Sequence, residues 1–223
     1  MKVEPTTKYG CEAQCTARGE AYTLLTPGAF IQPTDDGRIL WHILNYTPDE
    51  DQSKTYNAFA QAITIWQPAF PSTITLDSTS DPDEAHIKLY FVNENHPQYG
   101  DIFDGEDGTL ALGFAPVDGE PLKGYILMDD GENWGDMHTP NTKDLLTVFL
   151  HELGHTFNLG HESRVRDAIM YPSYTGEKRQ IHQDDIDGIQ SIYGRFGPPR
   201  TEDGTPSGCL SFLIPFLALF GGI

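Results

Sequence analysis

The sequence has few cysteines and few basic residues, and both shortages exclude classes of protein. Its three cysteines are Cys11, Cys15 and Cys209. An odd count with only one closely spaced pair does not fit a zinc ribbon, which leaves a Cys11–Cys15 disulfide or free thiols as the alternatives. The 14 Lys and Arg residues stand against 33 Asp and Glu residues, giving a formal net charge of -19. This charge argues against nucleic acid or an anionic membrane surface as a partner.

Long apolar segments are scarce as well. After Met1 and Lys2, the first thirty residues offer no apolar stretch of the kind found in secretory signals. The tail, residues 209–223, is apolar but contains Pro215 and is too short for an ordinary transmembrane helix. It is preceded by small residues, as in a lipid-anchor signal, but the usual polar spacer is missing. A disordered tail is the alternative, so membrane association through it stays open.

The segment 151–161 carries most of the recognisable chemistry, with the sequence His-Glu-Leu-Gly-His-Thr-Phe-Asn-Leu-Gly-His. On a helix, His151 and His155 would project from one face about a turn apart, near enough to bind one metal ion. Neutral imidazoles are good zinc ligands, and a catalytic zinc with three protein ligands keeps its fourth position for water or substrate. His161 is the expected third ligand, and Glu152 lies beside the first.

The third histidine can return to the metal only if the helix ends between His155 and His161. The chain must then turn through a residue that tolerates a positive φ, and Asn158 and Gly160 are both candidates. Left-handed geometry costs asparagine more than glycine by about 1 kcal/mol. That cost is small against the binding free energy of zinc, so we expect the turn to form.

The pattern His-Glu-x-x-His-x-x-Gly-x-x-His is that of the metzincin clan of zinc peptidases, and this sequence resembles it with Asn158 in place of the usual glycine. Met170 lies in a segment, residues 168–172, that is similar to the methionine turn beneath the metal in these enzymes. Its Met-Tyr-Pro sequence is similar to that of the matrixins, the catalytic domains of matrix metalloproteinases. The resemblance covers about residues 38–194.

The resemblance implies an α+β fold of the metzincin, or zincin-like, type. A twisted, mostly parallel five-stranded sheet with an antiparallel edge strand is expected together with three helices. The chain divides into four expected segments: an extended or disordered lead-in at 1–36, a matrixin-like catalytic domain at 37–195, a linker at 196–208 and the short apolar tail at 209–223.

The spacing of apolar residues agrees with such a fold. Helical spacing predicts an amphipathic helix over residues 52–66, and residues 184–194 are similar to the last matrixin helix. Strands are expected at 38–46, 72–77, 85–92, 109–115 and 124–129. Candidate N-terminal caps are Thr47 with Glu50 for the first helix, and Asn141 or Thr139 for the helix of the histidine motif.

Two further metal sites of matrixins can be compared with this sequence. Asp104 begins a turn similar to the family's calcium loop, and Asp129 and Glu132 follow at the matching spacing, so a structural calcium ion is implied. Three of the four residues at the positions of the family's structural zinc cannot bind zinc in that geometry; the four are Tyr99, Asp101, Leu112 and Leu127. We therefore expect one zinc ion, the catalytic one, together with calcium.

The resemblance also implies where a substrate would bind. The edge strand, with Leu110, Ala111 and Leu112, would pair with an extended polypeptide through main-chain hydrogen bonds. Pro172 and Tyr174 are similar to the wall of the pocket for the side chain after the cleaved bond. The partner is accordingly a protein or peptide substrate, and the chain is expected to be a monomer.

Together these features predict a zinc-dependent endopeptidase. Zinc would lower the pKa of a bound water, Glu152 would accept its proton and pass it to the leaving amine, and Met170 would support the site without binding the metal. The alternative is a catalytically inactive zinc-containing binding module, against which Glu152 counts because a structural site needs no base. By resemblance the protein is secreted or extracellular, although no signal peptide is visible, and neither Cys11 nor Cys15 matches the family's inhibitory propeptide motif.

Overall fold

Five strands form the main sheet of the computed structural model, which describes residues 22–93, 96, 99, 102–136 and 138–194. The strand order is β2 (Thr75–Ser78), β1 (Arg38–Ile43), β3 (Ile87–Val92), β5 (Tyr125–Asp129) and β4 (Ala111–Gly113). Only β4 runs antiparallel to its neighbour in this sheet. A second, two-stranded sheet pairs β6 (Trp134–Gly135) with β7 (Lys143–Asp144). The expected mostly parallel five-stranded sheet with an antiparallel edge strand is confirmed.

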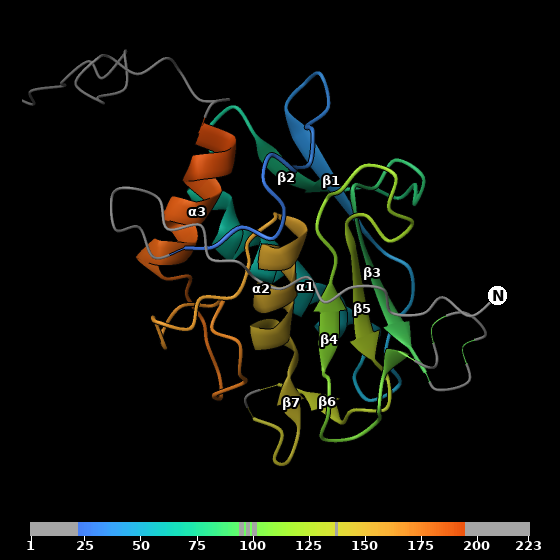
Figure 1. Cartoon of the computed structure of the whole chain (residues 1–223). Coiled ribbons are helices and arrows are strands. Elements are labelled where there is room, and N and C mark those ends of the chain that lie inside the picture. The colour runs from blue at the N-terminus through green and yellow to red at the C-terminus, as the bar shows by residue number, and fades with distance from the viewer. Residues whose placement is uncertain (1–21, 94–95, 97–98, 100–101, 137, 195–223) are drawn as a thin grey trace, which may run out of the picture.

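Three α-helices lie within the described residues: α1 (Gln52–Trp66), α2 (Leu145–Thr156) and α3 (Gln183–Tyr193). A short 3-10 helix, η1 (Gln67–Ala69), extends α1. Figure 1 shows α2 between α3 and the sheet. The bounds of α1 agree with those predicted from apolar spacing, and the α+β class is confirmed.

The helix caps differ from those predicted. Asp51 caps α1 in place of Thr47, and its carboxylate accepts a hydrogen bond from the backbone two residues later at 2.7 Å. Asp144 caps α2 in place of Asn141 or Thr139, again through its carboxylate, at 2.8 Å. Both predictions were wrong because a nearer aspartate satisfies the free amides of the first turn.

An aromatic core fixes α1 and α2 against the sheet. Phe59 of α1 contacts Trp41 of β1, with ring centroids 5.3 Å apart, and Phe149 of α2, with centroids 5.2 Å apart. Phe149 in turn contacts Phe91 of β3 at 6.4 Å. Trp41 and Phe91 share one face of the sheet by their register, so both helices pack on that face. Edge-to-face aromatic pairs of this kind add to the stability gained from burial.

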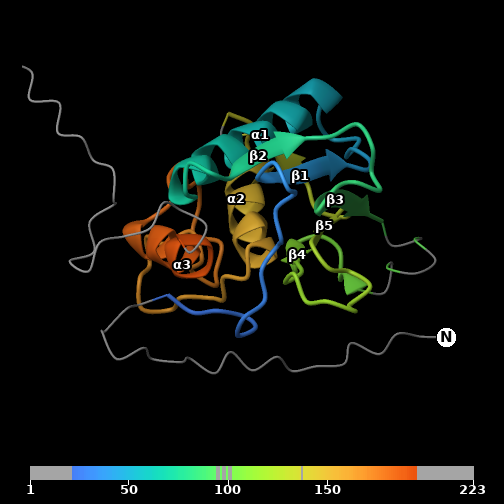
Figure 2. The ribbon, with the colours of Figure 1, turned by 90° about the horizontal axis from the view of Figure 1, so that it is seen from above.

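The N-terminal segment, residues 22–36, runs past α3 and α2, as Figure 2 shows in blue. It contains buried side chains, among them Thr23 and Ile31, and forms an isolated antiparallel bridge between Leu24 and Leu159. The remainder of the predicted lead-in, the linker at 196–208, the apolar tail and all three cysteines lie outside the described residues. Within the described part of the chain, no helix is long and apolar enough to cross a membrane.

Candidate metal centre

Helix α2 delivers two of the three histidines. His151 and His155 stand four positions apart on it, while the side chains of Leu150 and Leu153 are fully buried against the core. The indole nitrogen of Trp66 donates to the carbonyl oxygen of Leu150 at 3.0 Å, directly before the first histidine. Packing and this bond together set the rotation of α2, and with it the direction of both imidazoles.

The chain leaves α2 through Asn158, whose φ is 77°. Of the two candidates for this turn, Asn158 and Gly160, the structure therefore uses the asparagine. The backbone N–H of Asn158 donates to the carbonyl oxygen of His155 at 2.9 Å, which tightens the end of the helix. Three residues later His161 has returned to the side of α2 that carries the other two histidines.

The three imidazoles converge on one point, as predicted. Nε2 of His161 lies 3.2 Å from Nε2 of His151 and 3.2 Å from Nε2 of His155. Tetrahedral zinc with bonds of about 2.05 Å requires its nitrogen ligands to stand about 3.3 Å apart. Among the described residues this is the one cluster of three or more His, Cys, Asp or Glu side chains arranged to hold a metal ion.

The backbone orients two of these rings for metal binding. Nδ1 of His151 lies 2.7 Å from the carbonyl oxygen of Ile169, and Nδ1 of His155 lies 2.8 Å from that of Leu159. When Nδ1–H donates to these carbonyls, each Nε2 keeps its lone pair for the metal. The residues present therefore fit a zinc ion.

Burial keeps the histidines neutral, which zinc ligands must be. It lowers the pKa of His151 to about 4, despite the opposing hydrogen bond to Ile169. The pKa of His155 falls well below its ordinary value, through burial and the two neighbouring imidazoles, and burial also lowers that of His161. At pH 7 the site therefore presents three unprotonated rings.

Glu152 is a buried carboxyl beside this cluster. It is 6% exposed, and no hydrogen-bond partner of its Oε2 is found within the described chain. Burial raises its pKa to about 8, against a lowering hydrogen bond from the backbone of Gly113 in β4. A Cβ atom on Gly113 would lie 3.0 Å from Oε2, so the edge strand approaches the carboxyl closely. A buried carboxyl with a perturbed pKa and one oxygen without a hydrogen-bond partner in the described chain is a candidate for proton transfer.

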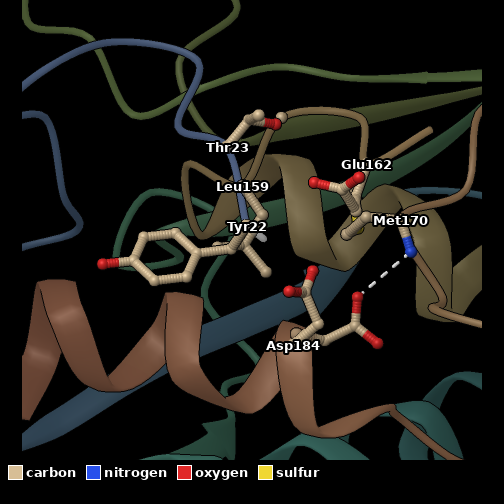
Figure 3. Close-up of a pocket in the computed structure, with 8 residues that line it drawn as sticks. Tyr22, Thr23, Leu159, Glu162, Met170 and Asp184 are labelled. Atoms are coloured by element: carbon tan, nitrogen blue, oxygen red, sulfur yellow. Dashed lines mark hydrogen bonds between the residues drawn. The ribbon is translucent and has the colours of Figure 1, made fainter. Parts of the chain in front are cut away.

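The methionine turn lies against α2. A Cβ atom on Gly154 would lie 2.2 Å from Sδ of Met170, which is 2% exposed. The carboxylate of Asp185 accepts hydrogen bonds from the amides of Ile169 and Met170, at 2.9 and 3.2 Å; the second is the dashed line in Figure 3. Since the carbonyl of Ile169 contacts His151, this turn connects α3 to a candidate metal ligand.

The three candidate calcium ligands surround one loop. Asp129 accepts from the amide of Gly105 at 3.1 Å, Glu132 from Gly108 at 3.1 Å, and Asp104 from Thr109 at 2.8 Å. Asp129 and Glu132 are each 2% exposed. They do not form a cluster as close as that of the histidines.

Two carboxylates after β5 each have a buried oxygen suited to a cation, Glu132 beside Gly108 and Asp130 beside Thr47 and Asp49. Oε2 of Glu132 and Oδ1 of Asp130 are buried, and neither has a hydrogen-bond partner in the described structure. Burial, together with Asp49 and Asp129, raises the pKa of Asp130. Asp130 was not predicted from the sequence as a cation ligand, and its place directly after Asp129 was the one signal for it. Carboxylate oxygens without partners are what a calcium ion would neutralise.

The candidate substrate residues lie on two separate elements. Ala111 and Leu112 belong to β4, the sheet edge, and Leu110 precedes them. Pro172 is exposed, and Tyr174 is 42% exposed, its hydroxyl accepting a hydrogen bond from the amide at the start of α2. The assignment of these residues to substrate binding stays a prediction.

An ion pair that was not predicted from the sequence joins the loop between the methionine turn and α3 to the start of α2. Arg179 donates to both carboxylate oxygens of Asp144, at 2.6 and 2.8 Å. This is the aspartate that caps α2, and the Thr147 hydroxyl bonds to it as well at 2.6 Å. The pairing therefore links the loop after the methionine turn to the helix that carries two histidines.

The positions compared with the family's structural zinc ligands are only partly described. Leu112 and Leu127 are paired across β4 and β5, and Leu127 is fully buried. Tyr99 is described, while Asp101 lies outside the described residues. The expectation that no second zinc binds here stays a prediction.

Several known proteins have sequences similar to this chain. The sequence model of the matrixin family matches residues 33–194. The chain is 36% identical over 209 residues to the interstitial collagenase of Sus scrofa, covering 91% of this chain and 41% of that protein. It is 34% identical over 191 residues to the neutrophil collagenase of Homo sapiens (83% and 38%), and 39% identical over 160 residues to metalloendoproteinase 1 of Glycine max (67% and 49%). The chain thus spans less than half the length of these relatives.

Proposed function

The chain belongs to the matrixin family of zinc endopeptidases, and on that premise we propose that it hydrolyses peptide bonds of extended polypeptides. The observation that carries the proposal is the convergence of three imidazoles beside the buried carboxyl of Glu152, with Nε2 of His161 3.2 Å from Nε2 of each of the other two. His151, His155 and His161 would hold the zinc, and three protein ligands leave a coordination position open for water or substrate.

Each residue of the site has a distinct role in this proposal. When bound, zinc supplies a water of lowered pKa and polarises the carbonyl of the bond to be cut. Glu152 accepts a proton from that water and transfers it to the leaving amine. Met170, packed against Gly154, supports the turn whose carbonyl orients His151. Burial raises the pKa of Glu152 to about 8 in the metal-free site, and a zinc ion beside it would favour the carboxylate form that accepts the proton.

The substrate would lie along the edge strand. Residues 110–112 would pair with it through main-chain hydrogen bonds, which favours an extended polypeptide over a folded one. Pro172 and Tyr174 would form the wall beside the side chain that follows the cut bond. The names of the collagenase relatives support a protein substrate outside the cell, and we propose a secreted location on that basis.

Calcium would have a structural role. Asp104, Asp129 and Glu132 would supply carboxylate oxygens from the loop beside β5, and the unpartnered buried oxygen of Glu132 supports this assignment. Calcium binding here would hold the segment that leads into β4, the strand proposed to contact substrate.

The rival proposal is a zinc-containing module without catalysis. A fluorogenic peptide assay on the whole chain, with zinc, with calcium, and after zinc removal by 1,10-phenanthroline, separates the two. The endopeptidase predicts cleavage that stops on zinc removal and returns with added zinc. A zinc-loaded chain that leaves extended peptides of varied sequence uncut would support the rival.

A further inference from the structure

The third histidine of the cluster is the one that α2 does not hold. His151 and His155 stand on a helix of 12 residues, and each Nδ1 is fixed by a carbonyl oxygen. His161 follows the turn at Asn158, and its side chain is partly exposed. Its distance from the other two imidazoles therefore depends on whatever fixes the backbone from residue 158 to 161.

The N-terminal segment is hydrogen-bonded to this backbone. The main-chain links are Leu25 N to Asn158 O at 3.1 Å, Gly160 N to Thr23 O at 2.8 Å, and the antiparallel bridge between Leu24 and Leu159. The Thr23 hydroxyl also donates to the carbonyl oxygen of His161, the candidate ligand itself, at 2.6 Å. Figure 3 shows Thr23 and Leu159 close to each other.

The side chain of Asn158 adds three hydrogen bonds to the same segment. Its Oδ1 accepts from the amide of Thr26 at 2.9 Å, and its Nδ2 donates to the carbonyl oxygens of Thr26 and Ala29 at 2.7 and 2.8 Å. The residue is fully buried, so these bonds are shielded from water. Glycine, usual at this place in the motif, would allow the positive φ but make none of these bonds.

We propose that Asn158 is a positioning residue for His161, and that its side chain makes the zinc affinity of the site depend on residues 23–29. The asparagine turns the chain and ties the turn to a segment 132 residues away in sequence. Without the side-chain amide of Asn158, the loop that carries His161 would sample positions in which Nε2 of His161 does not reach the metal. The inference rests on the zinc site of the proposed function, but not on hydrolysis.

Asn158→Gly tests this most cleanly, because glycine accepts a φ of 77° without strain and introduces no charge. Zinc affinity would be measured on the whole chain by competition with a chromophoric chelator, in the presence of calcium. We expect binding about 10-fold to 100-fold weaker than in the parent, the usual effect of losing a group that orients a metal ligand. An affinity within twofold of the parent would overturn the proposal.

Asn45 offers a matched control. Its side chain also joins two chain segments, donating to the carbonyl oxygen of Phe91 at 2.8 Å and accepting from the amide of Phe91 at 2.7 Å. Asn45→Ala removes both bonds without touching the histidine turn. This substitution should lower the free energy of unfolding and leave zinc affinity within twofold of that of the parent. A loss of zinc affinity equal to that of Asn158→Gly would mean a global effect and would also overturn the proposal.

Thr23→Val provides a second, independent variant. It removes the hydroxyl that bonds to the carbonyl of His161 and leaves the Asn158 side chain in place. Zinc affinity should fall several-fold, and if Asn158→Gly does not fold, an unchanged affinity in Thr23→Val overturns the proposal. All of these readouts are zinc affinities. A parent that binds zinc yet cleaves no peptide would refute the proposed function and leave this inference standing.

Discussion

Replacing Glu152 with glutamine should separate catalysis from metal binding. The substitution keeps the size of the side chain and removes its ability to accept a proton. Loss of a general base typically lowers the rate by about 10²-fold to 10⁴-fold. Zinc content should not change, because the metal is assigned to the three imidazoles alone.

The same substitution should alter how the stability of the zinc-free chain depends on pH. The folded-state pKa of Glu152 is about 8 against an ordinary 4.5, so between these values the folded chain retains a proton that the unfolded chain releases. The free energy of unfolding therefore falls as pH rises, and from pH 5 to pH 7 this group removes roughly 2–3 kcal/mol. Glutamine does not titrate, so the variant should lack this loss.

The histidines change the free energy of unfolding with pH in the opposite direction, and their contribution must be subtracted. The pKa of His151 is lowered to about 4 from 6.5, so between these values the unfolded chain binds more protons and stability rises with pH. This contribution is present in the parent and in Glu152→Gln alike. The difference between the two proteins therefore isolates Glu152.

The assay is urea unfolding followed by tryptophan fluorescence, at pH 5 and pH 7, with 1,10-phenanthroline to remove zinc and calcium kept in excess. Relative to the parent, Glu152→Gln should gain roughly 2–3 kcal/mol between the two pH values. Equal changes in the two proteins would refute the placement of Glu152 as a buried, protonated carboxyl. Peptide cleavage by zinc-loaded Glu152→Gln within tenfold of the parent would refute its role as base.

Three further predictions concern groups around the site. Gly154→Ala places a Cβ atom 2.2 Å from Sδ of Met170, so stability to urea should fall by about 1–3 kcal/mol and zinc should dissociate faster; unchanged values would contradict the packing. Glu132→Gln should reduce the rise in Tm that calcium gives the parent, and an undiminished rise would place calcium elsewhere. Arg179→Met removes the cation paired with the buried Asp144, so Tm should fall and peptide KM should rise. Arg179→Lys should give values of Tm and KM between those of the parent and Arg179→Met.

The sequence predicted the features that depend on local pattern. The histidine motif lies within 11 residues, and helical spacing defined α1 from Gln52 to Trp66. Parallel strands and an antiparallel edge followed from the family resemblance. The caps were wrong because several polar residues precede each helix, and the choice among them depends on small differences in geometry.

Contacts between distant segments could not be predicted in this way. Both Asn158 and Gly160 were candidates for the positive φ of the turn. Asn158 adopts it and also bonds through its side chain to a segment 129 to 132 residues earlier, which the local sequence does not show. Arg179 pairs with Asp144 across 35 residues, and no spacing rule connects them. The substrate residues on β4 and after the methionine turn stay predictions, because only a bound peptide can test them.

X-ray absorption at the zinc edge, combined with metal analysis of the purified whole chain, tests the central claim most directly. The account predicts one zinc per chain with three imidazole nitrogens at about 2.0–2.1 Å and a further light-atom ligand at the open position. A chain without zinc, or a zinc ion bound by sulfur or by fewer than three imidazoles, would contradict it.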